Sequence, residues 1–78
     1  MPMPQVLNAT ALTGARRCEI HDFKIVGKVD DRPMAVILVK WNGEWLTAKY
    51  KEGDREWFYG NYHGKDETAA RKDFASRK

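Results

Sequence analysis

Residues 35–50, AVILVKWNGEWLTAKY, determine how the chain folds. The first half is a nearly continuous run of apolar and β-branched residues, which is typical of a central strand with both faces at least partly covered. Asn42-Gly43 then interrupts the run, and this pair favours a type I′ turn because it tolerates positive φ at both central positions. The segment therefore predicts a hairpin of strands 35–41 and 44–50.

A two-residue turn also sets the register of the two strands. One side, here called the apolar face, pairs Trp41 with Glu44, Val39 with Leu46, Ile37 with Ala48 and Ala35 with Tyr50. The other side, here called the mixed face, pairs Lys40 with Trp45, Leu38 with Thr47 and Val36 with Lys49. We expect each face to need its own cover.

A further strand is expected on each side of the hairpin. Residues 19–29 alternate between apolar and polar, and the turn 30–33 connects them to the hairpin. Residues 55–62 are the next strand; a two-residue loop at 52–53 places Trp57 and Tyr59 on the apolar face and Phe58, Gly60 and Tyr62 on the mixed face. A three-residue loop would exchange the two sets. The shorter loop is preferred because it sets Gly60 opposite Trp45, where the indole can cover the bare glycine backbone.

Residues 67–78 are expected to form a helix with Asp66 as its N-cap and Ala70 and Phe74 as a narrow apolar stripe. This helix is expected to cover the apolar face. The predicted fold is α+β: an antiparallel sheet of about four strands with one C-terminal helix packed on one face. Residues 1–15 are read as an N-terminal arm, and 16–78 as a single domain.

One helix cannot cover both sides of the sheet, so the mixed face is the candidate binding site. Its residues interleave aromatic rings with cations: Trp45, Lys40, Lys49, Phe58, Tyr62 and Arg55. This composition suits a protein hot spot and equally a base-stacking platform. The alternative is that Lys40 over Trp45 is an intrachain cation–π pair and that the arm covers the remainder.

The partner expected for this face is a host protein or nucleoprotein complex, or a second copy of the chain. Nucleic acid is less favoured, because the net charge is only +3 and acids interrupt the basic residues. Cys18, His21 and His63 fall short of a four-ligand metal set, so neither a metal nor a cofactor nor catalysis is expected. A single cysteine and short apolar runs predict a cytoplasmic protein without membrane segments.

Residues 43–75 resemble the three-stranded-sheet-plus-helix DNA-binding domain of plant ethylene-response factors and some phage integrases. The resemblance is carried by Gly43-Glu44-Trp45-Leu46, Arg55-Glu56-Trp57, Gly60-Asn61-Tyr62 and Glu67-Thr68-Ala69-Ala70-Arg71. It implies a sheet that enters the major groove, with Trp45, Lys40, Lys49 and Arg55 at contact positions. The strand that is arginine-rich in that family is here almost all apolar. In size and composition the chain also looks like small phage and mobile-element proteins of the anti-CRISPR type, which implies an inhibitor of a host nucleoprotein.

Overall fold

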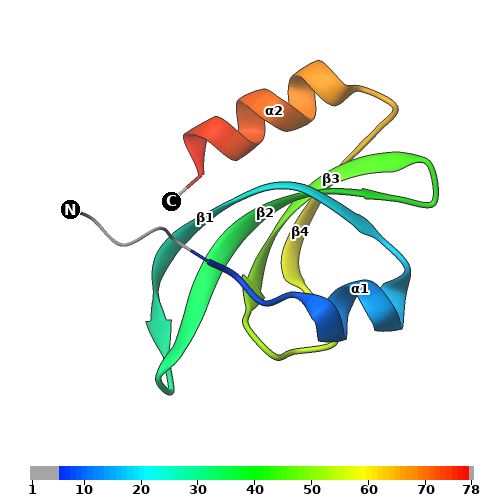
Figure 1. Ribbon diagram of the computed structural model, residues 1–78. Helices are drawn as coiled ribbons and strands as arrows, with labels where there is room; N and C mark the ends of the chain where they lie inside the picture. Colours follow the sequence, from blue (N-terminus) through cyan, green and yellow to red (C-terminus); the bar gives the residue numbers. More distant parts are fainter. Residues whose placement is uncertain (1–5, 78) are drawn as a thin grey trace.

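The computed structural model describes residues 6–77 and contains a four-stranded sheet with two helices (Figure 1). The elements are, in chain order, α1 (Thr10–Arg16), β1 (Glu19–Val29), β2 (Arg32–Trp41), β3 (Glu44–Lys51), β4 (Phe58–Gly64) and α2 (Glu67–Ser76). The strands form one antiparallel meander in the order β1-β2-β3-β4. The predicted α+β class and the C-terminal helix on one face are confirmed; residues 1–5 of the predicted arm lie outside the described residues.

The central hairpin has the predicted turn and register. Asn42 and Gly43 adopt φ of 53° and 75°, as a type I′ turn requires. Every pair predicted between residues 35–41 and 44–50 is present. A second tight turn joins β1 to β2 through Asp30 and Asp31, which also have positive φ. Because both turns are short, β1 pairs with β2 and β2 pairs with β3 in sequence order.

The two helices lie on opposite sides of the sheet (Figure 1). Helix α1 covers the apolar face, where its Leu12 is fully buried in the main core. Helix α2 covers part of the mixed face, where Ala70 and Phe74 pack against Leu38 and Trp45. The expectation that the C-terminal helix covers the apolar face is therefore wrong. The N-terminal segment supplies the cover that the apolar face needs.

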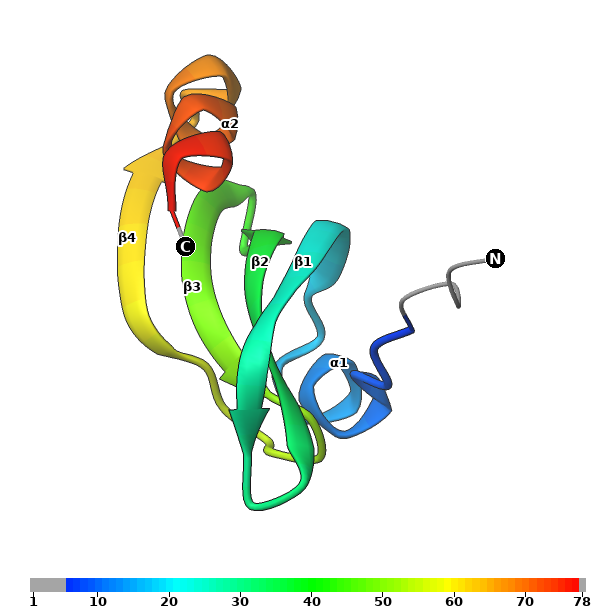
Figure 2. The same ribbon diagram turned by 90° about the vertical axis from the view of Figure 1, so that its left-hand side faces the viewer.

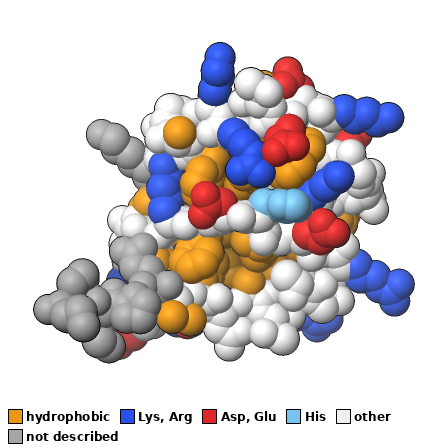
Figure 3. Space-filling view, turned by 45° about the horizontal axis from the view of Figure 1, so that its top comes forward, with side chains coloured by type: hydrophobic (Ala, Val, Ile, Leu, Met, Phe, Trp, Pro, Cys, Tyr) orange, Lys and Arg blue, Asp and Glu red, His pale blue; other side chains and the backbone are white. Residues whose placement is uncertain are grey.

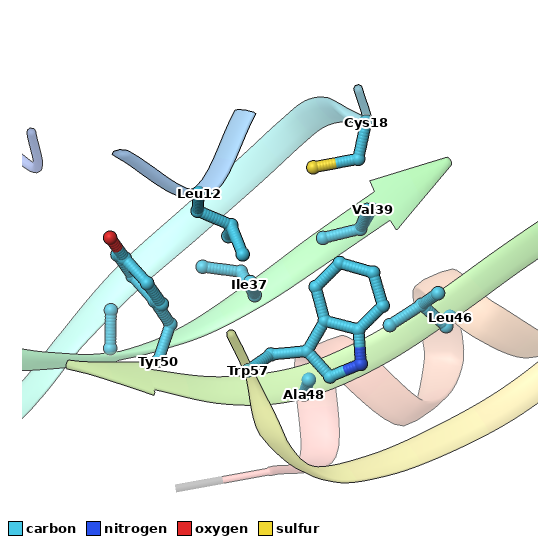
Figure 4. Packing of buried hydrophobic residues seen from close by; sticks show 9 residues of the cluster. Leu12, Cys18, Ile37, Val39, Leu46, Ala48, Tyr50 and Trp57 are labelled. Carbon is cyan, nitrogen blue, oxygen red and sulfur yellow. The ribbon is translucent and has the colours of Figure 1, made fainter. Parts of the chain in front are cut away.

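The main core lies between α1 and the apolar face, where its side chains converge (Figure 4). Its buried members are Leu12, Cys18, Ala35, Ile37, Val39, Leu46, Ala48, Tyr50 and Trp57. The hydroxyl of its Tyr50 is hydrogen-bonded, because it donates to the Asp54 carbonyl at 2.6 Å. Burial raises the pKa of the Cys18 thiol. Cys18 is thus part of the apolar packing.

Helix α2 begins at the predicted cap. The Asp66 carboxylate accepts the Ala69 N–H at 2.9 Å, which satisfies one of the free donors of the first turn. At the other end, the Lys24 ammonium from β1 donates to the Ala75 carbonyl at 3.3 Å and lies 5.0 Å from the Phe74 ring centroid. A cation is favourable there, at the negative end of the helix. Neither helix is long and apolar enough to cross a bilayer, counting only residues that the structure describes.

Strand β4 differs from its predicted register. The connection after β3 spans residues 52–57, where Arg32 Nη1 donates to the Glu52 carbonyl and to Asp54 Oδ1, both at 3.4 Å. The longer loop shifts the strand, so that Gly64 and not Gly60 faces Trp45. Two placements hold: Trp57 joins the apolar core and Phe58 pairs with Lys49 on the mixed face. Three are wrong: Tyr62 pairs with Leu46 on the apolar side, Gly60 lies beside Tyr62 and Trp57 rather than opposite Trp45, and Tyr59 is 73% exposed rather than packed.

Candidate functional site

Trp45, the centre of the predicted binding face, is only 7% exposed. Cationic groups lie over its ring from two elements: Lys40 Nζ at 5.5 Å and the Arg71 guanidinium at 5.6 Å from the centroid. The His21 ring lies 4.7 Å away on the β1 side. The structure therefore places Trp45 beneath α2, with Lys40 as an intrachain cation partner, and Trp45 is not available as an exposed stacking ring.

The other sequence-predicted residues gather along β4, which forms one edge of the sheet (Figure 2). Phe58 and Lys49 pair across the mixed face, Tyr62 projects on the opposite side, and Arg55 is exposed in the loop that enters β4. Tyr59 and Arg77 join them in the folded chain. We call this set the β4 surface: Lys49, Arg55, Phe58, Tyr59, Tyr62 and Arg77.

Tyr59 occupies a bulge in β4. Its φ is 53°, a left-handed conformation that is costly for a bulky side chain, and the pairing with β3 is irregular between Thr47 and Lys49. Consecutive residues of a regular strand point to opposite faces. Here the bulge brings the Tyr59 ring to 5.4 Å from the Phe58 ring, edge to face. The result is a pair of neighbouring rings at the edge of the sheet, one of them largely exposed.

Arg77 supports the bulge from the end of α2. Its Nη2 donates to the Tyr59 carbonyl at 2.9 Å, and its Nη1 donates to the Thr47 hydroxyl at 3.0 Å. Two of the five guanidinium N–H groups are thus used inside the fold, and the group keeps its positive charge beside the backbone of Tyr59. The same side chain therefore stabilises the bulge and supplies a positive charge beside it.

Tyr62 is held on the opposite side of β4. Its hydroxyl accepts a hydrogen bond from Trp57 Nε1 at 3.0 Å, and its ring is 54% exposed. A Cβ at position 60 would lie 3.0 Å from the Tyr62 ring, so the glycine there makes room for it. The bare glycine is thus covered by Tyr62 and Trp57, in place of the predicted Trp45. The Arg16 guanidinium lies 4.8 Å from the Trp57 ring and 3.6 Å from Glu56.

A half-buried polar network fastens α2 to β3 and β4. Asp73 Oδ2 accepts hydrogen bonds from the Thr47 hydroxyl and from Asn61 Nδ2 at 3.1 Å, and His63 Nε2 lies 3.0 Å from the same oxygen. Burial alone would raise the pKa of Asp73, but these hydrogen bonds and the charge of His63 outweigh it and lower that pKa to about 2. The carboxylate is thus committed to holding the helix in place.

The network makes the fold sensitive to acid. The folded pKa of Asp73, about 2, lies below the reference value of 3.8, so its stabilisation is fully present above pH 3.8 and is lost as the pH falls towards 2. The expected loss in the free energy of unfolding is about 2 kcal/mol. Urea titrations between pH 5 and pH 2 measure it. Asp73→Asn should flatten this pH dependence, whereas Asp30→Asn, in an exposed turn, should leave it unchanged; equal profiles for the two variants would contradict the assignment.

The side of the molecule on which α2 comes forward carries charges of both signs around exposed hydrophobic side chains (Figure 3). Among them, Arg71 Nε donates to Glu67 Oε2 at 2.7 Å, one turn apart on the helix. Since acids lie among the basic groups there, this side does not present a field of one sign. It is a weaker candidate for a charged partner than β4.

No family model, curated protein or solved structure matches the chain. The two resemblances noted from the sequence therefore stay predictions. Within residues 6–77 no cluster of three or more His, Cys, Asp or Glu side chains has the arrangement to hold a metal ion, and no pocket is found. The candidate site is a surface.

Sequence reasoning missed Tyr59 and Arg77. The strand period of two predicts Tyr59 on the packed face, whereas the bulge in β4 turns it outward. A signal was present in Gly60, since a glycine inside a strand pattern often marks a bulge. Arg77 had no local signal: its two acceptors, at positions 47 and 59, are brought to it only by the docking of α2.

Proposed function

We propose that this protein acts without catalysis, by docking the β4 surface onto a larger partner that is a protein or a nucleoprotein complex. The observation that carries the proposal is Tyr59, a bulky residue with φ of 53° whose ring is 73% exposed. A left-handed backbone costs such a residue about 1–2 kcal/mol, and a mostly exposed ring recovers little of that by packing. Strain of this kind is concentrated at functional sites.

The neighbours of Tyr59 support the same surface. Phe58 and Tyr62 add partly exposed rings, and Lys49 and Arg77 add positive charge beside them. Aromatic residues and arginine are the types that dominate binding energy at interfaces. The titratable pair His63 and Asp73 is engaged in fastening α2, which favours binding over chemistry. The inhibitor role implied by the size of the chain stays a prediction.

Site-specific photocrosslinking tests the proposal. A benzophenone side chain is placed at position 59 or 62, and as a matched control at position 26 or 29, which are exposed valines of β1. After irradiation in the organism that carries the gene, we expect discrete high-mass adducts from positions 59 and 62. Adducts from the β1 positions alone, or none from β4, would refute docking through this surface.

The strain at Tyr59 has a separate consequence for stability. Asparagine tolerates the left-handed conformation, so Tyr59→Asn should raise the free energy of unfolding by about 1 kcal/mol. The matched control is Tyr62→Asn, the same change at a position without positive φ, which loses the hydrogen bond from Trp57 and should lower stability by about 1 kcal/mol. Urea denaturation compares the two. The same sign for both variants would mean that Tyr59 is not strained.

A further inference from the structure

We infer that the β4 surface binds single-stranded nucleic acid, with one base stacked on Tyr59 and a second on Tyr62. This inference rests on the proposed function and names the strand of a nucleoprotein as the part contacted. Single strands are bound by exposed aromatic rings that accept bases and by cations that follow the phosphates. The exposed rings lie on β4, an edge strand, and the cations come from the neighbouring β3 and from the end of α2.

The bulge in β4 disfavours backbone pairing between this edge strand and a strand of a partner. An edge strand can recruit another strand by its free N–H and C=O groups, which would suit a peptide or a second copy of the chain. In β4 the ladder to β3 is irregular on both sides of the pairs formed by Leu46 and Thr47, and the carbonyl of Tyr59 already accepts from Arg77. Bulges of this kind are a means of terminating strand pairing. The side chains, and not the backbone, are what β4 offers.

Cations lie beside residues 58 and 59, one from β3 and one from the end of α2. Lys49 pairs across the sheet with Phe58, so its side chain starts about 5 Å from that residue, and the Arg77 guanidinium bonds to the carbonyl of Tyr59 itself. Asp73 is an ionised carboxylate near these cations, since the Thr47 hydroxyl bonds to both Asp73 and Arg77. Asp73 offsets one of the two positive charges, so Lys49, Arg77 and Asp73 together carry a net charge of +1 beside Tyr59 and Phe58, the sign that attracts phosphates.

The second ring, that of Tyr62, has both positive and negative charges around it. Tyr62 is tied to Trp57, and the cation over Trp57 is Arg16, which also pairs with the exposed Glu56. Glu44 follows the hairpin turn on the same face, two residues before the partner of Tyr62. We therefore assign the stronger contact to Tyr59 and the weaker to Tyr62.

Fluorescence anisotropy with a labelled oligothymidine of 20 nucleotides, at low salt, tests the inference on the intact chain. We expect binding that exceeds that of a duplex of equal length. Tyr59→Asn should weaken it about tenfold, which is the range for loss of one stacked base, and Tyr62→Asn should weaken it less. Tyr59→Phe keeps the ring and should retain the affinity.

The salt dependence separates specific contacts from general attraction. Lys49→Gln should reduce the slope of log affinity against log salt by about 0.7, the value for one phosphate contact on a single strand. Lys28→Gln removes the same charge from an exposed position on β1, the opposite edge of the sheet, and should leave the slope unchanged. Far-ultraviolet circular dichroism of each variant verifies that it is folded.

Three results would overturn the inference: no binding of the single strand at low salt, unchanged affinity in Tyr59→Asn, or equal effects of Lys28→Gln and Lys49→Gln. If the single strand does not bind at low salt but crosslinks from position 59 persist after nuclease treatment, the proposed function still holds, because the surface then contacts a protein. Absence of both oligonucleotide binding and crosslinks refutes the two together.

Discussion

Trp45→Ala is expected to lower the free energy of unfolding strongly rather than only to remove a binding contact. Trp45 is 7% exposed and packs with Leu38 and Ala70 in the cluster between α2 and the sheet. Truncation of a buried tryptophan to alanine costs about 3–5 kcal/mol, through lost burial and the cavity left behind. That is a large share of the stability of a small domain, typically about 5–15 kcal/mol in total. Urea denaturation followed by circular dichroism measures the loss without relying on the removed fluorophore.

Tyr62→Ala is the control for that experiment. Its ring is 54% exposed, and the interaction lost is the hydrogen bond from Trp57, so we expect a cost of about 1 kcal/mol. The two substitutions should therefore differ by a factor of three or more in their effect on stability. Similar small losses in both would mean that α2 leaves Trp45 exposed in solution. In that case the mixed face would return as a candidate docking site.

Leu12→Ala should show that the N-terminal segment belongs to the folded domain. Leu12 is fully buried and is the residue of α1 that enters the main core beside Ile37 and Tyr50. Replacing a buried leucine by alanine costs about 2–5 kcal/mol. Because α1 has only seven residues and an isolated helix of that length is unstable in water, loss of this anchor should also release the helix. Urea denaturation measures the first effect, and hydrogen exchange of the α1 amides measures the second.

Val6→Ala tests the same segment without touching the core. Val6 is 71% exposed, so the change should alter stability by less than about 0.5 kcal/mol. If Leu12→Ala were equally mild, residues 10–16 would lie outside the cooperatively folded unit. A large difference between the two variants instead places α1 inside the cooperative unit.

The parts of the fold that the sequence predicted well are those set by neighbouring residues. Asn42-Gly43 can adopt the turn that joins β2 and β3 without strain, and a two-residue turn permits one register only, so the pairing of Trp41 with Glu44 and all pairs below it follow. Asp66 caps α2 through a bond within three residues. Local geometry was sufficient for these features.

The candidate site was predicted only in part, because the register of β4 depends on the loop that precedes it. Residues 52–57 are held by Arg32, which lies 20 positions before the carbonyl it binds, and no pattern within the loop signals that contact. Because the predicted register of β4 is wrong, Tyr62 was assigned to the mixed face and the bulge at Tyr59 was not predicted. Phe58, Lys49 and Arg55 stayed on or beside the same surface.

The amino-acid sequence by itself determined the meander of strands, its two tight turns, the two-faced pattern and the C-terminal helix, since each follows from spacing within a few residues. Only the tertiary structure decided which helix covers which face. Each helix has one fully buried residue, Leu12 in α1 and Ala70 in α2, so the choice depends on contacts between distant residues. Leu12 packs in the core of the apolar face, and Asp73 accepts a hydrogen bond from the Thr47 hydroxyl 26 positions away. That choice buries Trp45 and leaves the rings of β4 as the surface open to a partner.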